Sequence, residues 1–204
     1  MVMNKLIIDR NDFGIFYRQQ EPNLCGVATL QTELLNLFPS HSKHKVPENQ
    51  RSLKTLLERL YKKKFREKYG KKPGHSNYII NERNGTDVYH FRNIAEYCEL
   101  GAFTKFHGSI DKLKYLMDQG IWPIIHRPYL DDNGKIDGHY VLVYNYNHSM
   151  QIFDPDSETG GLIEEPYDVF DHNWRYPNPE SDERWFIFLH EQGKLKIPFK
   201  GKYL

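Results

Sequence analysis

The stretch 17-YRQQEPNLCGVATL-30 places Gln19 six residues before Cys25, which is one of only two cysteines in the chain. Behind the cysteine, apolar residues recur at helical spacing until Pro39, and this predicts a helix over 25–38 that begins at the cysteine. A cysteine that only fills a core needs neither a preceding glutamine nor a position at the start of a helix. Cys25 is therefore a candidate nucleophile.

The two cysteines differ in their predicted surroundings. The thiolate is the reactive form of cysteine, and the amino terminus of a helix favours it. Cys25 stands at such an end, with Gly26 behind it to leave room for a substrate. Cys98 lies on the apolar face of a predicted helix over 87–99, capped by Thr86, where burial favours the neutral thiol. We expect Cys25 to react and Cys98 to belong to the core.

Length and composition limit the class of protein. The chain has 204 residues, of which 39% are hydrophobic and 14% aromatic, as in a soluble globular domain with a proper core. No apolar run approaches the roughly 20 residues that span a bilayer, and the amino terminus lacks the pattern of a signal peptide. Two cysteines are too few for a disulfide framework. We expect a cytoplasmic protein, with export by a route that uses no signal peptide left open.

Charge is distributed unevenly, although the net charge is only +1. Residues 61–72 (YKKKFREKYGKK) hold seven basic residues and one acid, whereas 154–191 holds eleven acids against two arginines. A basic run of this kind can bind nucleic acid or an acidic partner, but leucines at helical spacing also indicate an ordinary solvated helix face. No nucleic-acid-binding motif accompanies the charges, so we do not expect nucleic acid. Contact of a basic helix over 52–72 with an acidic partner is a hypothesis.

The type of predicted element changes along the chain. Helices are predicted over 25–38, 52–69, 87–99 and 110–119, and strands rich in branched and aromatic residues over 121–126, 139–146, 150–154 and 185–190. Helices followed by strands indicate an α+β fold with an antiparallel sheet. We expect one domain over 1–204, with a basic helical insertion at about 40–85.

A thiol nucleophile needs a base, and the base needs a group that orients it. His139 follows Gly138 and opens the predicted strand HYVLVYNY, and Asp154 closes the predicted strand MQIFD fifteen residues later. His41 and His44 have a spacing that metal ligands also use, but no second pair of ligands stands out in the sequence. We therefore expect no metal and no cofactor, and we assign the base to His139.

The predicted hairpin brings this histidine and Asp154 together. If the strands fold back about residues 146–147, the opposed pairs are Val143 with Met150, Val141 with Ile152, and His139 with Asp154. Directly opposed residues have Cβ atoms roughly 4.5–5.5 Å apart, so a carboxylate can reach an imidazole N–H and fix its tautomer. A structural ion pair in an ordinary hairpin is the alternative. The presence of Cys25 and Gln19 favours a catalytic role.

Gln19 completes the candidate site. Its side-chain amide, with the backbone N–H of Cys25, can donate hydrogen bonds to the oxyanion of a tetrahedral intermediate. Gln20 stands beside it, and spacing alone does not decide between the two glutamines.

These motifs resemble the papain-like cysteine peptidases. The matching residues are Gln19, then CGVAxL over 25–30, then GHYVLV over 138–143, then Asp154-Pro155. The branch that they resemble most is that of the bacteriocin-processing, double-glycine leader peptidases and their free-standing soluble relatives.

The resemblance extends over residues 15–38 and 86–156. It implies a papain-like fold in which a helical amino-terminal half carries the nucleophile and an antiparallel carboxy-terminal half carries the histidine and the aspartate. It also implies that Cys25 is the nucleophile, His139 the base and Asp154 its orienting group, and that Gln19 lines the oxyanion hole.

Three functions compete. The leading one is a cysteine hydrolase that cleaves a peptide or isopeptide bond in a peptide or protein substrate through a covalent acyl-enzyme. The second is a glutamine deamidase, transglutaminase or other acyl transferase that uses the same triad, because fold does not decide chemistry. The third is a non-catalytic binding module on a papain-like shell, of which a broken triad would be the sign. The complete set of cysteine, histidine and aspartate favours an enzyme.

Overall fold

The computed structural model of the chain describes residues 8–21, 23–42, 44–74, 78–80, 85–130, 136–156, 158–175, 184–195, 198 and 202–203. The predicted insertion at 40–85 and the acidic segment 154–191 each lie partly outside these residues. In chain order the elements are β1 (Ile8–Asn11), β2 (Gly14–Tyr17), α1 (Cys25–Leu37), α2 (Pro39–Ser42), α3 (Gln50–Tyr69), α4 (Val88–Tyr97), β3 (Leu100–Lys105), α5 (Ile110–Asp118), β4 (Ile124–Leu130), β5 (Ile136–Tyr146), β6 (Met150–Asp154), β7 (Gly161–Glu165), α6 (Tyr167–Trp174), β8 (Phe186–Glu191) and β9 (Lys202–Tyr203).

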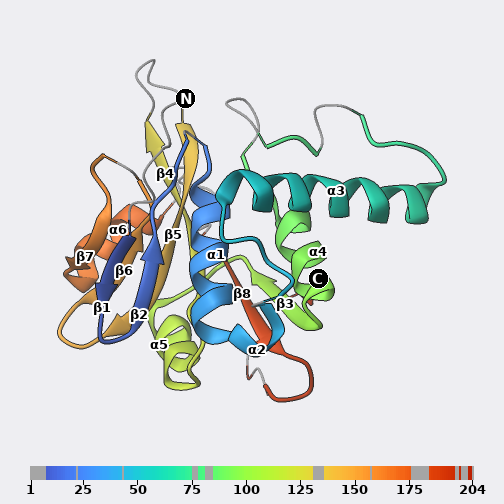
Figure 1. Cartoon of the computed structure of the whole chain (residues 1–204). Coiled ribbons are helices and arrows are strands. Elements are labelled where there is room, and N and C mark those ends of the chain that lie inside the picture. Colours follow the sequence, from blue (N-terminus) through green and yellow to red (C-terminus); the bar gives the residue numbers. More distant parts are fainter. Residues whose placement is uncertain are drawn as a thin grey trace.

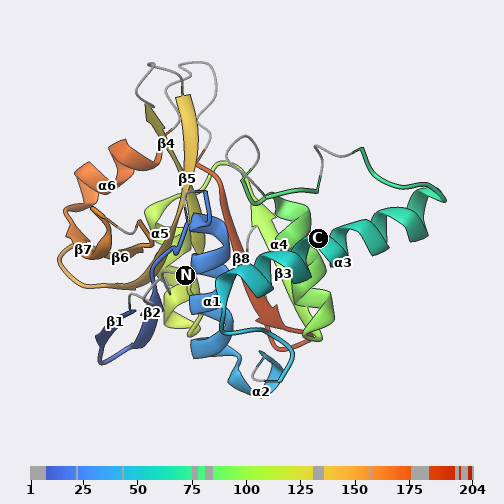
Figure 2. The same cartoon turned by 45° about the horizontal axis from the view of Figure 1, so that its top comes forward.

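Seven of these strands form an antiparallel sheet in the order β7-β6-β5-β4-β8-β3-β9, and β1 and β2 form a separate hairpin. On one face, α1, α3 and α4 pack with strand residues such as Leu142; on the other, α5 and α6 pack with residues such as Val141 and Val143 (Figures 1 and 2). Because successive side chains of a strand point to opposite faces, the continuous apolar run of β5 fills two cores at once.

Helix α1 is enclosed by the rest of the chain. Every residue from Cys25 to Leu34 is buried, and the helix packs against β5, β2 and α3. A helix buried all round must satisfy its polar side chains within the protein. Thr29 and Thr32 do so by donating their hydroxyls to carbonyls of α1 itself, at 3.0 Å from Cys25 O and 2.9 Å from Ala28 O.

Polar side chains of α1 also hold β2 in place. The Thr32 hydroxyl accepts the N–H of Tyr17 at 3.0 Å, and the Asn36 amide both accepts from the N–H of Ile15 and donates to its carbonyl, at 3.0 and 2.6 Å. Gln19 lies two residues beyond the end of β2. The position of this glutamine is therefore fixed from α1.

The elements predicted from periodicity are present with shifted ends, but several others were not predicted. Helix α4 is capped by Asp87 rather than Thr86, because the Asp87 carboxylate accepts the N–H groups of Tyr89 and His90 at 2.9 and 3.0 Å. Cys98 lies at the end of this helix and is fully buried. Strands β1, β2, β3, β7 and β9 and helices α2 and α6 were not predicted, since each is short and its apolar pattern is weak.

The strands that carry His139 and Asp154 pair in a different register from the predicted one. Val143 lies opposite Ile152, and not opposite Met150 as the sequence predicted. Continuing this register places Asp154 opposite Val141, so His139 and Asp154 are diagonal neighbours rather than directly opposed. Because the shift is two residues and side chains alternate with a period of two, both stay on one face of the sheet.

The turn between these strands explains the shift. The side chain of Asn147 accepts the N–H groups of His148 and Ser149, and its own N–H donates to the Ser149 carbonyl at 3.1 Å. A turn over 147–149 replaces the two-residue turn that the sequence predicted. A β-bulge between Val143 and Asn145 absorbs the remaining residue.

Helix α3 contains the predicted basic helix and begins two residues before it. The side chain of Asn49 caps it by accepting the N–H of Ser52 at 3.0 Å, and Gly70, with φ +64°, ends it. The buried stripe of α3 consists of Leu53, Leu56, Leu57 and Leu60. Its second half projects past α4 (Figures 1 and 2). Among the helices of the described residues, none has both the length and the apolar character needed to cross a bilayer.

Glu33 of α1 gives the fold a dependence on pH. Burial raises the pKa of its carboxyl to about 8, against the opposing effect of the Leu189 N–H, which donates to Oε1 at 3.0 Å. The pKa of this carboxyl is higher in the folded protein than in the unfolded chain. Glu33 therefore favours the folded state fully at low pH, and this contribution to the free energy of unfolding is lost as the pH rises through about 8.

A Glu33→Gln variant should lack this dependence, since glutamine keeps the acceptor for Leu189 and carries no charge. Between about pH 5 and pH 9, the free energy of unfolding should fall by roughly 2–4 kcal/mol more in the wild type than in the variant. Urea unfolding at several pH values measures the difference. Parallel pH profiles for the two proteins would contradict it.

Candidate active site

Cys25 is the first residue of α1, and its side chain faces a cleft. Leu24, which precedes it, provides no side-chain cap, so the N–H groups of the first turn remain available at the positive end of the helix. The cysteine is 8% exposed and lines a cleft of about 860 Å³. The sequence prediction that the helix begins at the cysteine is confirmed.

The sequence suggested that Gly26 makes room for a substrate, and this interpretation is wrong. A Cβ at this position would lie 2.6 Å from the Cβ of Thr86 and 3.0 Å from the ring of Tyr140. The Tyr140 hydroxyl donates to the Thr86 carbonyl at 2.8 Å, which fixes both neighbours. The glycine therefore allows α1 to approach β5 closely, and this closeness brings Cys25 to the beginning of that strand.

His139 lies between Cys25 and Asp154. Its Nε2 is 2.7 Å from Asp154 Oδ1, and Cys25 is close enough to the same ring to raise its pKa. Since Nε2 is occupied by the carboxylate, Nδ1 is the atom left for the thiol. The diagonal arrangement on the sheet thus still permits the contact that the sequence predicted, because the imidazole is long enough to span it.

The charges of these groups support one another. Burial opposes the charged form of His139, but the hydrogen bonds with Asp154 and Cys25 outweigh it and raise the pKa of the imidazole to about 10. Burial also works against ionisation of Asp154, yet the hydrogen bond with His139 brings the carboxyl pKa below its ordinary value. The pair is therefore an imidazolium and a carboxylate at neutral pH.

Gly138 precedes His139 because another ring occupies the space beside it. A side chain there would collide with the imidazole of His126, which also packs against Tyr140 and Trp185. Burial, together with the smaller effect of the neighbouring His139, lowers the pKa of His126 to about 4. His126 is thus a neutral packing group that holds the start of β5 in position.

Gln19 lines the same cleft and is nearly buried. Its own N–H donates to the Pro155 carbonyl at 2.7 Å, and its side-chain Nε2 donates to Asp156 Oδ2 at 3.2 Å. Because Nε2 carries two hydrogens, one remains for a group in the cleft. Gln20 is held differently, since its N–H donates to Gln50 Oε1 at 2.9 Å.

The sequence did not predict that Asp156 bonds Gln19 or that Gln50 bonds the residues on either side of it. Asp156 also lines the cleft, and its other oxygen accepts the N–H groups of Glu158 and Thr159, both at 2.9 Å. Its position two residues after Asp154, just beyond the end of β6, was a signal that it lies near the same site. Gln50 had no such signal, because thirty residues separate it from the loop it contacts.

The sequence also did not predict the residues that form the other wall of the cleft. It comes from β4 and α6, and it includes Arg127, Tyr129, His172 and Arg175. Arg127 forms a two-bond ion pair with Glu165, at 3.0 and 2.6 Å. Among the described residues, no group of three or more histidine, cysteine or acidic side chains is placed to hold a metal ion.

No protein-family model matches the chain, and no curated protein matches it. Among solved structures, the chain is similar to the crystal structure of a candidate C39-like peptidase from Bacillus anthracis, with a TM-score of 0.50 at 16% sequence identity. The similarity covers 91% of this chain and 94% of that chain. At this identity the likeness is one of fold, and it confirms the predicted papain-like α+β fold.

The geometry predicts unequal reactivity of the two thiols. Cys25 should be alkylated by iodoacetamide at about pH 6 at least tenfold faster than Cys98, because imidazolium stabilises a neighbouring thiolate. Cys98 should resist until the protein unfolds, since burial raises its pKa to about 11. Mass spectrometry of the labelled peptides measures both rates. Equal rates in native protein would contradict the assignment.

Asp154→Asn provides the matching variant. It removes the carboxylate that raises the His139 pKa, so the imidazolium is lost at lower pH and alkylation of Cys25 should slow. Asp156→Asn is the control, because Asp156 lines the same cleft but bonds Gln19 and not the imidazole.

Proposed function

We propose that the protein is a cysteine hydrolase that cleaves a peptide or isopeptide bond, with Cys25, His139 and Asp154 as its catalytic residues. The observation that carries the proposal is the placement of all three side chains at one open cleft, with Asp154 Oδ1 2.7 Å from His139 Nε2 and Cys25 beside the same ring. An isolated structural ion pair would not require a third group that is a nucleophile at a helix terminus.

Each of these three side chains has a role in acyl transfer. The Cys25 thiolate attacks the carbonyl carbon, and the pair of electrons on the carbonyl moves to its oxygen. The protonated Nδ1 of His139 then donates its proton to the leaving amine, which departs and leaves an acyl thioester on Cys25. Neutral His139 next takes a proton from water as the water attacks the thioester, and the thiolate is released.

Asp154 and Gln19 stabilise the charges that this reaction requires. Asp154 holds the imidazole by Nε2, which directs Nδ1 at the thiol and stabilises the imidazolium. The free hydrogen of Gln19 Nε2, together with the backbone N–H of Cys25, donates to the oxyanion of the tetrahedral intermediate. The hydrogen bond with Asp156 orients the glutamine so that its amide nitrogen, and not its oxygen, is presented.

Two finer assignments belong to the same proposal. The spacing of the motifs groups the chain with the soluble relatives of the double-glycine leader peptidases, which implies a peptide or protein substrate. Both cysteines are free and buried, and this supports a reducing, cytoplasmic location.

A peptide library derived from a proteome tests the reaction type. Wild-type protein should generate new amino termini, and Cys25→Ser protein should generate none. Mass spectrometry separates the competing chemistries, because a deamidase converts glutamine to glutamate without fragmenting the peptide and a transferase joins an amine to it. A library unchanged by folded wild-type protein would refute the hydrolase.

Gln19→Ala tests the oxyanion assignment. Turnover should fall by roughly 10²–10³ while iodoacetamide alkylation of Cys25 stays the same, because the amide acts on charge that develops on the substrate. Gln20→Ala is the control, and the larger loss in that variant would move the role to the neighbouring glutamine.

The basic helix supports a second proposal, contact with an acidic partner. A hollow of about 220 Å³ lies between α3 and α4, where Tyr61 and Phe65 contact each other and Tyr89 contacts Tyr61 at its edge. Lys68 and Arg92 line it, and neither forms an ion pair with a described residue. The hollow is smaller than a small-molecule site, and it fits one large side chain of an acidic polypeptide segment.

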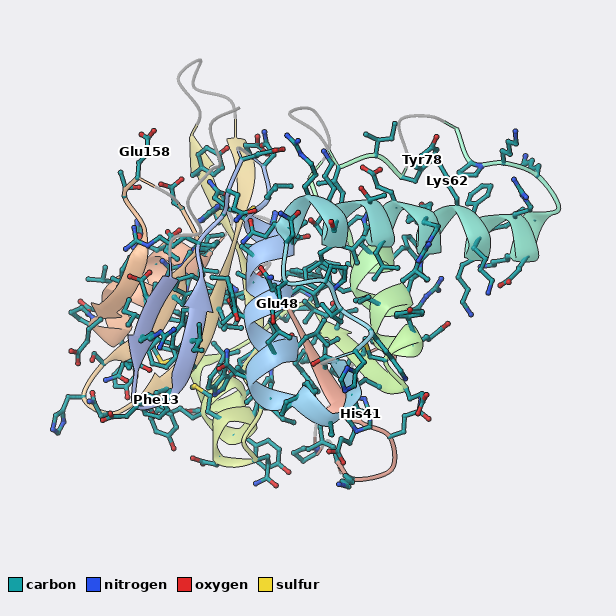
Figure 3. All side chains as sticks on the ribbon, in the orientation of Figure 1. Phe13, His41, Glu48, Lys62, Tyr78 and Glu158 are labelled. Atoms are coloured by element: carbon teal, nitrogen blue, oxygen red, sulfur yellow. The ribbon has the colours of Figure 1, made fainter. Side chains whose placement is uncertain are left out.

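Another face of α3 is covered in part by the chain itself. The Nζ of Lys62 lies 4.2 Å from the ring centre of Tyr78, which belongs to the segment 78–80 (Figure 3). The hollow toward α4 is therefore the side of this basic helix on which we expect the partner.

Charge reversal tests this contact. A fluorescein-labelled peptide with one phenylalanine among glutamates should bind, and Lys68→Glu with Arg92→Glu should weaken binding about tenfold. Lys54→Glu, on the same helix but outside the hollow, is the control. Fluorescence anisotropy measures each affinity. Equal binding by the double variant, or tighter binding of a single-stranded oligonucleotide, would contradict the proposal.

A further inference from the structure

Gln50 is the first residue of α3, and its side chain reaches the loop that carries Gln19. Its Oε1 accepts the N–H of Gln20 at 2.9 Å, and its Nε2 donates to the carbonyl of Arg18 at 2.8 Å. Gln50 is fully buried. One planar amide thus binds the backbone on both sides of Gln19.

The N–H of Gln19 itself donates to the carbonyl of Pro155 at 2.7 Å, and Pro155 directly follows Asp154. Gln50 from one side and Pro155 from the other therefore hold three consecutive residues of this loop. With its backbone fixed, the side chain of Gln19 has few ways to turn. One of them brings Nε2 to Asp156 at the wall of the cleft.

Only an amide can fulfil both parts of this contact. Glutamine has an acceptor and a donor in one plane, whereas a carboxylate has no hydrogen to give to the Arg18 carbonyl and an ammonium has no acceptor for the Gln20 N–H. Burial excludes the water that would otherwise replace either bond. The requirement is thus for the chemistry of the side chain and not for its volume alone.

The start of α3 is itself held rigidly against the rest of the site. Gln31 of α1 donates its Nε2 to the carbonyl of Glu48 at 2.5 Å, and Glu48 lies beside α1 (Figure 3). Arg51 forms an ion pair with Glu21 at 2.6 Å, on the same loop as Gln19. The basic helix is therefore anchored at the helix that carries the nucleophile.

We propose that Gln50 is a positioning residue for the oxyanion-binding amide of Gln19, so that the amino-terminal end of α3 belongs to the active site. The inference rests on the proposed function, because it assigns Gln50 a role in that reaction. Gln50 touches no substrate and acts only through the loop over 18–20.

Gln50→Met tests the role, because methionine has a similar shape and forms neither hydrogen bond. Thr104→Val is the control, since it removes a buried hydrogen bond, to the Phe186 carbonyl, that takes no part in holding the loop or the start of α3. The probe is N-acetylglycinal, an aldehyde that adds reversibly to a thiol and gives an oxyanion like that of the tetrahedral intermediate. Iodoacetamide alkylation of Cys25, which forms no oxyanion, is measured in parallel.

Gln50→Met should weaken aldehyde binding at least tenfold, with the alkylation rate unchanged, and Thr104→Val should alter neither. The loss should disappear when Gln19 is already alanine, because the two residues act through one amide. Unchanged aldehyde affinity in folded Gln50→Met, or a loss of full size in the Gln19→Ala background, would overturn the proposal. If Gln50→Met does not fold, Gln50→Glu keeps the acceptor, removes the donor and takes its place.

Hydrogen exchange separates this inference from the proposed function. Gln50→Met should speed exchange of the Gln20 N–H, whose acceptor it removes, and leave the Gln19 N–H protected by Pro155. If the wild type is alkylated but binds no aldehyde, the hydrolase fails, and the proposal for Gln50 fails with it. Fast exchange at Gln20 would then show that only the structural clamp is present, whereas slow exchange would refute the clamp as well.

Discussion

The burial of α1 from Cys25 to Leu34 is the constraint on which the rest of the structure depends. A helix enclosed on every side has no water to satisfy its polar groups, so its hydroxyl and amide side chains bond to backbone around it. Those bonds fix β2 through Thr32 and Asn36, and the connection to α3 through Gln31. The same enclosure leaves the first turn of the helix as the part that opens into the cleft, and Cys25 stands there.

The candidate site is assembled from four parts of the chain that meet at the amino-terminal end of α1. The thiol comes from the helix, the imidazole and the carboxylate from neighbouring strands, and the amide from the loop after β2. Close approach decides how they meet, because Gly26 lets α1 lie against Thr86 and Tyr140, and Gly138 makes room for the ring of His126. Hydrogen bonds then determine which groups carry charge. The imidazolium of His139 exists at neutral pH because Asp154 and Cys25 outweigh its burial.

Helix α3 has two distinct parts. Its first turn is buried against the site through Gln50, whereas its second half carries lysines and tyrosines past the body of the protein (Figures 1 and 2). Helix α3 therefore joins the loop over 18–20 to a charged outer surface by one continuous element. The leucine stripe of α3 holds this basic segment to the fold.

The sequence by itself determined the start of α1 at Cys25, the strands that carry His139 and Asp154, and the α+β class, because each depends on local periodicity and on residue chemistry. It also predicted that His139 and Asp154 share a face, since an error of two residues in register leaves the alternation of side chains intact. The register itself, the purpose of Gly26, and the roles of Asp156 and Gln50 were decided only by the tertiary structure. The reason is physical. The hydrogen bonds of Asn147 determine the length of the turn, and the role of a glycine or a buried amide depends on atoms that are thirty or more residues away in the sequence.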